Sequence, residues 1–114
     1  MRLPLPCAIA AIAIAALLAS ADRPNAQDAT AFQKRGEALL AKNCARCHAI
    51  GHTGASVHAE APAFRTLSKK YSIESLAESL AEGLFTGHPD MPEFTFEAED
   101  VGAILDYLTS IQDR

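Results

Sequence analysis

The feature that most constrains this chain is the segment 44–48 (CARCH), which brings two thiols and an imidazole together. Apart from Cys7 near the N-terminus, Cys44 and Cys47 are the only cysteines in the 114 residues. Side chains three residues apart share one face of a helical turn, and His48 follows the second thiol directly. A fold of this chain therefore has to present all three side chains to one common target.

The spacing C-x-x-C-H is the motif of c-type haem attachment. Each thiol can form a thioether with one haem vinyl group, and the adjacent histidine is then held beneath the iron, where a ring nitrogen can ligate it. The sequence predicts one covalently bound haem c, attached through Cys44 and Cys47, with His48 as an axial iron ligand.

Three other uses of the cysteines stay open at this point. A disulfide between Cys44 and Cys47 would close a very short loop and leave His48 without a role. A thioredoxin-like redox motif requires a βαβ context, and no strand is evident. A zinc site would use both thiols and two histidines, although the histidine spacing fits no common zinc-finger pattern. The candidate histidines are His48, His52, His58 and His88.

The N-terminal residues predict export. Arg2 precedes an apolar core of 13 residues, 7–19, whereas a bilayer span needs ~20 residues. Residues 19–21 (ASA) form a small-x-small cleavage pattern. We expect a signal peptide over 1–21, a loose leader over 22–29 and one domain over 30–114, with an uncleaved N-terminal anchor as the alternative. Export implies an oxidising compartment and no stable membrane insertion after cleavage.

The charge distribution argues against nucleic-acid binding. Without Arg2, nine basic and fourteen acidic side chains remain, a net charge of −5, and no basic tract is present. Residues 22–70 carry a net charge of +4 and residues 71–114 a net charge of −9. This asymmetry gives the molecule a dipole that can orient a charged partner.

Apolar periodicity predicts three helices and no strand, which is an all-α fold class. Thr30 and Gln33 form a capping-box pair before a helix over 31–43. Ser72 is the expected N-cap of a second helix that ends at Gly83 or Gly87. The apolar face of the first helix contains Phe32, Gly36, Leu39 and Leu40, and that of the second contains Ile73, Leu76, Ala77, Leu80 and Leu84.

The last helix begins with acidic side chains, which are favourable near the positive end of the helix dipole. These are Glu97, Glu99 and Asp100, and its apolar stripe consists of Val101, Ile104, Leu105, Leu108 and Ile111. A further short helix is expected near 66–71. Three amphipathic helices form a small core, and chains of this size often need a metal, disulfide or cofactor for reinforcement.

Met91 is the candidate for the second axial iron position. It is the single methionine after residue 21, and it lies in a loop between Pro89 and Pro92 rather than on an apolar helix face. The two prolines stiffen the loop and can aim the thioether at little entropic cost. His52, His58 and His88 are the bis-histidine alternatives. A filled sixth position leaves no site for oxygen or substrate, so the prediction is electron transfer rather than catalysis.

The chain resembles the class I c-type cytochromes, specifically the small periplasmic bacterial ones, over most of residues 31–112. The resemblance rests on Gly36-x-x-x-Leu40-x-x-x-Cys44, the C-x-x-C-H motif, Met91-Pro92 and a final helix with Ile104 and Tyr107. It implies a small cytochrome c fold of three main helices around one haem. It also implies that the first and last helices cross near Gly36, with Tyr107 packed closely there.

The resemblance carries further expectations for the site. A proline after the haem motif, here Pro62, would orient the proximal histidine through its backbone carbonyl. Family members often place a Trp at the haem propionates, and this chain has none. The substitutes expected here are Arg65, Lys69, Lys70 and Tyr71.

The predicted function is a periplasmic monohaem electron carrier, not an enzyme, that is a monomer and exchanges electrons with redox partners. The alternative function is a haem subunit of a dehydrogenase or oxidase complex, or a ligand-binding haem protein. A zinc-binding structural module is a more remote alternative.

Overall fold

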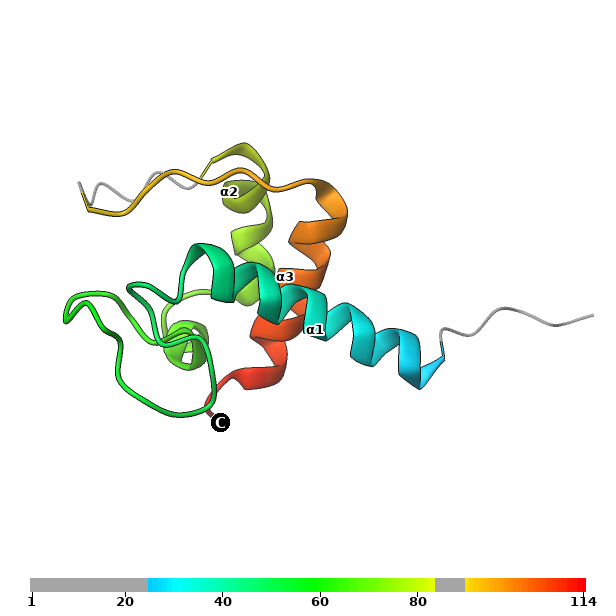
Figure 1. Cartoon of the computed structure of the whole chain (residues 1–114), viewed down its shortest axis with the longest axis horizontal. Helices are drawn as coiled ribbons and strands as arrows, with labels where there is room; N and C mark the ends of the chain where they lie inside the picture. The colour runs from blue at the N-terminus through cyan, green and yellow to red at the C-terminus, as the bar shows by residue number, and fades with distance from the viewer. Residues whose placement is uncertain (1–24, 84–89) are drawn as a thin grey trace, which may run out of the picture.

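The computed structural model describes residues 25–83 and 90–114, and every regular element in these ranges is helical (Figure 1). In chain order the elements are α1 (Ala26–Asn43), the 3-10 helices η1 (Phe64–Lys69) and η2 (Ile73–Ser75), α2 (Leu76–Glu82) and α3 (Ala98–Ile111). The described residues contain no strand, and this confirms the all-α fold class with three main helices.

Helix α1 begins at Ala26, earlier than the sequence predicts, because Asn25 caps it. The Asn25 side chain accepts a hydrogen bond from the backbone N–H of Gln27 (3.5 Å). The expected capping box is wrong: the Thr30 hydroxyl donates to the carbonyl oxygen of Ala26 (2.9 Å), inside the helix. Residues 26–29, expected in a loose leader, are thus helical and exposed, and these turns extend past α3 in Figure 1.

Helices α1 and α3 cross at a glycine. A Cβ placed on Gly36 would collide with the backbone carbonyl of Ala103 and lie 3.0 Å from the Cβ of Tyr107. A side chain at position 36 would therefore hold the two backbones apart. Figure 1 shows the crossing of α1 and α3, and the contacts of Gly36 place it there with Tyr107 beside it, as the family resemblance implies.

The second predicted helix is divided in the structure. Its first turn is the 3-10 helix η2, and α-helical geometry starts only at Leu76. Ser72 precedes η2, but its hydroxyl donates to the Glu74 carboxylate (2.8 Å) instead of capping the backbone. The C-terminal end is as expected, since Gly83 adopts φ +116°, a conformation that favours glycine. Gly87 and Leu84 lie outside the described residues.

Helix α3 supplies most of the core. Glu97 is its N-cap residue and Glu99 and Asp100 lie in its first turn, as predicted. The predicted apolar stripe is buried, except that Leu105 is half-buried. The main core cluster unites α3 with α1, η1 and η2, and its members are Leu40, Phe64, Ile73, Ile104, Tyr107, Leu108 and Ile111.

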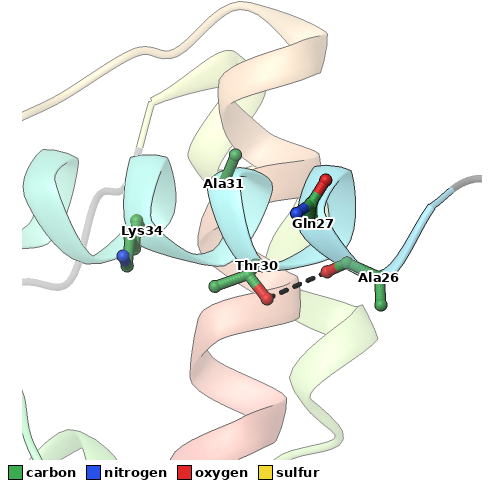
Figure 2. Close-up of a pocket in the computed structure, with 5 residues that line it drawn as sticks. All are labelled: Ala26, Gln27, Thr30, Ala31 and Lys34. Atoms are coloured by element: carbon green, nitrogen blue, oxygen red, sulfur yellow. Dashed lines mark hydrogen bonds between the residues drawn. The ribbon is translucent and has the colours of Figure 1, made fainter.

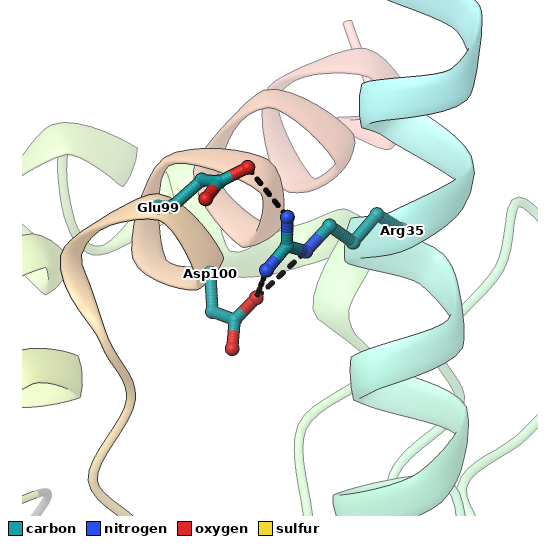
Figure 3. Close-up of polar contacts among 3 residues, drawn as sticks. All are labelled: Arg35, Glu99 and Asp100. Atoms are coloured by element: carbon teal, nitrogen blue, oxygen red, sulfur yellow. Dashed lines mark hydrogen bonds and ion pairs between the residues drawn. The ribbon is translucent and has the colours of Figure 1, made fainter.

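An ion pair also ties α1 to the N-terminal end of α3 (Figure 3). The Arg35 guanidinium donates to the Glu99 carboxylate (2.5 Å) and, through Nε, to the Asp100 carboxylate (2.8 Å). Asp100 is the more buried of the two acids, with 22% of its side chain exposed against 70% for Glu99. Arg35 directly precedes Gly36 in α1, so its ion pairs hold α1 and α3 together beside the point where the two helices cross.

The short helix expected near 66–71 is present as η1, shifted to Phe64–Lys69 and wound as a 3-10 helix. The C-terminal residues pack against it: the backbone N–H of Asp113 donates to the carbonyl oxygen of Arg65 (2.8 Å). Within the described residues, no helix combines the length and the apolar character required to cross a membrane.

Candidate functional site

The segment 44–48 forms a turn that continues directly from α1. The backbone N–H of Cys44 donates to the carbonyl oxygen of Leu40 (2.8 Å), and the N–H groups of Cys47 and His48 both donate to the carbonyl oxygen of Cys44 (3.0 and 2.9 Å). Because Leu40 is in the core, the turn is anchored to the helix packing. The fold thus presents two thiols and an imidazole from one helical end.

Both cysteines of the segment are free thiols, so the structure contains no disulfide between them. Burial, and secondarily the nearby Cys47, raises the pKa of the Cys44 thiol to about 11. Without haem, Cys44 is consequently a neutral thiol at neutral pH. In residues 25–83 and 90–114, no group of three or more His, Cys, Asp or Glu side chains is placed to hold a metal ion.

The imidazole ring of His48 is oriented by a hydrogen bond at one of its two nitrogen atoms. Its Nδ1 atom lies 2.8 Å from the carbonyl oxygen of Pro62, the hydrogen bond that a ligating histidine makes in its second coordination shell. A carbonyl only accepts, so Nδ1 carries a proton, and in the neutral imidazole Nε2 then has the lone pair that can bind a metal. The ring of Phe64 packs against the imidazole, with the ring centroids 4.6 Å apart and the planes tilted by 31°.

The loop between His48 and η1 is closed by its own hydrogen bonds. The N–H of His58 donates to the carbonyl oxygen of Cys47 (3.0 Å), and the N–H of Ala49 donates to the Ser56 hydroxyl (3.0 Å). The Tyr107 hydroxyl donates to the carbonyl oxygen of Ile50 (3.0 Å) and so joins the loop to α3. The segment after the C-x-x-C-H motif is therefore held in place before it reaches Pro62.

Met91 is half-buried and lies in the irregular segment that leads to α3. The segment is attached to α2 by the N–H of Phe96, which donates to the carbonyl oxygen of Leu80 (2.9 Å). Next to the methionine, the Asp90 carboxylate approaches Nε2 of His58 (3.8 Å). This contact brings the methionine segment to the loop that follows the cysteines. No hydrogen bond or ion pair of the described residues joins Met91 itself to His48.

The remaining candidates are the expected propionate contacts and two of the competing histidines. Arg65 is half-buried on η1, and its Nη1 atom is buried with no hydrogen-bond partner among the described residues. Tyr71 is 54% exposed, Lys70 is exposed, and Lys69 lies 3.9 Å from the Asp113 carboxylate. His52 is exposed, and His88 lies outside the described residues.

The surface hollow drawn in Figure 2 is separate from this site. Its lining residues, Ala26, Gln27, Thr30, Ala31 and Lys34, all belong to the exposed N-terminal turns of α1. Among the described residues, the hollow is lined by one helix surface, and none of its lining residues belongs to the segments that carry Cys44, Cys47, His48 or Met91.

Sequence reasoning misses Gln112. Its side-chain amide forms three hydrogen bonds, two of which join the end of α3 to η1, while the third stays within α3. Helix η1 carries the Phe64 ring that packs on His48. A glutamine after the last apolar residue of a helix has no local signature of such a role. The role is visible only in two hydrogen bonds to residues that are distant in the sequence. Ser68 lies 44 positions before Gln112, and Phe64 lies 48 positions before it.

The residues present fit haem c. Two thiols stand one helical turn apart, and the adjacent imidazole keeps Nε2 available because Pro62 occupies Nδ1. Half-buried apolar side chains that pack against the core are available to line a flat apolar macrocycle. These are Leu39, Cys44, Ile50, Leu67, Leu76, Leu80, Phe96 and Leu105.

Comparison with known proteins also supports a haem c site. Residues 31–108 match the sequence model of the family described as cytochrome c oxidase, cbb3-type, subunit III. The chain is 31% identical over 77 residues to cytochrome c-552 of Bradyrhizobium diazoefficiens, an alignment that covers 68% of this chain and 72% of that protein. No solved structure gives a significant match. The chain therefore belongs to the class I c-type cytochromes, electron carriers with covalently bound haem c.

Proposed function

We propose that this cytochrome is an exported, periplasmic monohaem carrier whose iron is ligated by His48 and Met91. The observation that carries the proposal is the 2.8 Å contact between His48 Nδ1 and the Pro62 carbonyl oxygen. A histidine held in this way has one nitrogen directed to a structural acceptor and the other available for iron. The single C-x-x-C-H motif in the chain supports one haem.

In the proposed mechanism, Cys44 and Cys47 hold the cofactor permanently. Each thiol would hold the haem through one thioether bond to a vinyl group, and this attachment needs no leaving group. Haem c, when bound, supplies a one-electron Fe(III)/Fe(II) couple. Covalent attachment prevents loss of the cofactor outside the cytoplasm, where the predicted signal peptide 1–21 would direct the chain.

The two axial residues have different tasks. The Pro62 carbonyl keeps the proton on Nδ1 of His48 and increases the basicity of the ligating nitrogen. Met91 would contribute a soft, neutral thioether, a ligand type that favours ferrous iron and a higher reduction potential. With both positions filled, the protein exchanges electrons with redox partners and does not bind substrate at iron. His52, His58 and His88 are the competing ligands.

The propionate contacts are proposed from the polar side chains of η1 and of the residues that follow it. Arg65 has a buried guanidinium nitrogen without a partner in the described residues, so it is the preferred donor. Tyr71, Lys69 and Lys70 are exposed and follow it in the same segment of the chain. We expect the protein to be a monomer.

Expression of the full chain in a bacterium that attaches haem to exported cytochromes tests the main proposal. The mature protein is expected to have the mass of residues 22–114 plus one haem, and to be found in the periplasmic fraction. Cys44→Ala and Cys47→Ala are each expected to lose one thioether, while Cys7→Ala, within the predicted signal peptide, leaves the mature mass unchanged. A mature protein that contains zinc and shows no Soret absorbance would contradict the proposal.

The family match favours a second candidate, an electron-transfer subunit of a respiratory oxidase. The matching family is described as subunit III of cbb3-type cytochrome c oxidase, whereas the named relative is described as a cytochrome c-552. A free carrier is expected to purify alone from the native organism. Stable co-purification with a large membrane complex would instead support the subunit role.

A further inference from the structure

The side chain of Gln112 forms three hydrogen bonds, and two of them connect the end of α3 to η1. Its Nε2 atom donates to the carbonyl oxygens of Phe64 and Leu108 (both 2.8 Å), and its Oε1 atom accepts from the backbone N–H of Ser68 (2.8 Å). Both amide hydrogens and the amide oxygen are used. If the amide were flipped, its Nε2 atom would face the N–H donor of Ser68 and its Oε1 atom would face two carbonyl acceptors. The network therefore permits one orientation.

The residues that Gln112 holds are those that surround His48. Phe64 has its carbonyl bound by Gln112 and its N–H bound to the carbonyl oxygen of Ala49 (2.9 Å), next to the histidine. The Phe64 ring packs on the imidazole at 4.6 Å. Pro62, whose carbonyl accepts from Nδ1, lies two residues before Phe64. The amide therefore fixes the backbone that carries both the acceptor and the packing partner of the imidazole.

We propose that Gln112 is a positioning residue for His48: it fixes η1, and through η1 it sets the strength of the hydrogen bond between His48 and Pro62. The inference rests on the proposed function, in which His48 ligates the haem iron. A stronger bond at Nδ1 makes the imidazole a better electron donor and stabilises ferric iron. Loss of the Gln112 contacts consequently raises the reduction potential.

Gln112→Met is the variant of choice, because methionine has similar length and volume but forms none of the three hydrogen bonds. In the haem-loaded protein, the equilibrium constant for reduction by a fixed mediator is expected to increase by roughly threefold to tenfold, less than the 10–100-fold effects of direct partners of a metal-ligating histidine. The paramagnetically shifted NMR signals of the His48 ring in the oxidised protein are expected to move as well.

Thr109→Val is the matched control at the same end of α3. It removes one hydrogen bond, from the Thr109 hydroxyl to the carbonyl oxygen of Leu105 (2.8 Å), that stays within the helix. Both readouts are expected to remain at their wild-type values in this control. Arg35→Gln weakens the packing of α1 on α3 at a distant site, and it tests whether loss of stability alone moves the potential.

The inference is overturned if Gln112→Met is less stable than the wild type but keeps its potential and its His48 signals. It is equally overturned if Arg35→Gln shifts both readouts to the same extent. If Gln112→Met does not accumulate, Gln112→Asn, which keeps the amide but shortens its reach, is measured with the same criteria. A wild-type spectrum without shifted His48 signals would refute the proposed ligation itself, and this separates the two failures.

Discussion

Gly36 of α1 lies against the backbone carbonyl of Ala103 of α3 so closely that no Cβ fits between them. The Cβ of Tyr107 bounds the same space, 3.0 Å from the position that a Cβ on the glycine would take. Because Cys44 and His48 follow on the end of α1, this approach also determines where the haem-binding turn meets the core. The helix crossing is thus a geometric requirement of the site as well as of the fold.

Gly36→Ala is expected to destabilise the haem-loaded protein. The added methyl group meets backbone atoms, which cannot rotate away, so the loss is at or above the usual overpacking cost of about 1–3 kcal/mol. Gly51→Ala is the control, since a Cβ there has no heavy atom within 4 Å. Urea unfolding measures both variants. Equal stabilities for the two would contradict the crossing geometry.

Tyr107→Phe tests the link between α3 and the loop after the haem motif. Its loss of the hydrogen bond to the Ile50 carbonyl oxygen is expected to lower the free energy of unfolding by about 0.5–1.5 kcal/mol at pH 7. Tyr71→Phe, at a side chain that is 54% exposed, is the control and is expected to remain within about 0.5 kcal/mol of the wild type.

The pH dependence of Tyr107→Phe gives a second readout. Burial, and secondarily Glu37, raises the pKa of the Tyr107 hydroxyl. The contribution of the neutral hydroxyl to stability is therefore fully present below the unfolded pKa of about 10 and is lost as the pH rises through the higher folded pKa. The stability difference between wild type and Tyr107→Phe is expected to shrink above about pH 10. A difference that stays constant into that range would contradict this account.

Arg35→Gln is expected to weaken the packing of α1 on α3 in a salt-dependent manner. The hydrogen bond to Asp100 is the main cause that raises the pKa of Arg35, with Glu99 adding a smaller effect. Exposed ion pairs are screened as the Debye length falls from about 10 Å at 0.1 M salt to about 3 Å at 1 M. Thermal unfolding should show a difference from wild type that decreases with added salt. Lys34→Gln, at the neighbouring exposed position, should show no such trend.

Some elements of this fold can be predicted from the sequence because their signals are local. Helix α3 has acidic residues at its start and a regular apolar stripe, and its observed bounds follow that pattern. The start of α1 differs from the prediction because Asn25 supplies a cap upstream of the more conspicuous Thr30 and Gln33 pair. Periodicity predicts α-helical geometry for the first turn of the second helix, but Ile73 is drawn into the core through a 3-10 turn.

The candidate site also combines features that the sequence predicts with features that it does not predict. The turn 44–48 is contiguous in the chain, so its geometry follows from the end of one helix. Pro62 is expected from the family resemblance, and its carbonyl lies at His48. The bond of Tyr107 to Ile50 and the network of Gln112 depend on how distant segments pack, and periodicity does not encode such contacts.

The central claim is that Met91 and His48 are the two axial ligands of one haem, and visible absorption of the oxidised protein tests it most directly. An iron–thioether bond gives a weak charge-transfer band, which is expected in the wild type and lost in Met91→Ala. His52→Ala and His58→Ala, the controls for the competing ligands, are expected to keep the band. A band that persists in Met91→Ala, or that is absent from the wild type, would contradict the assignment.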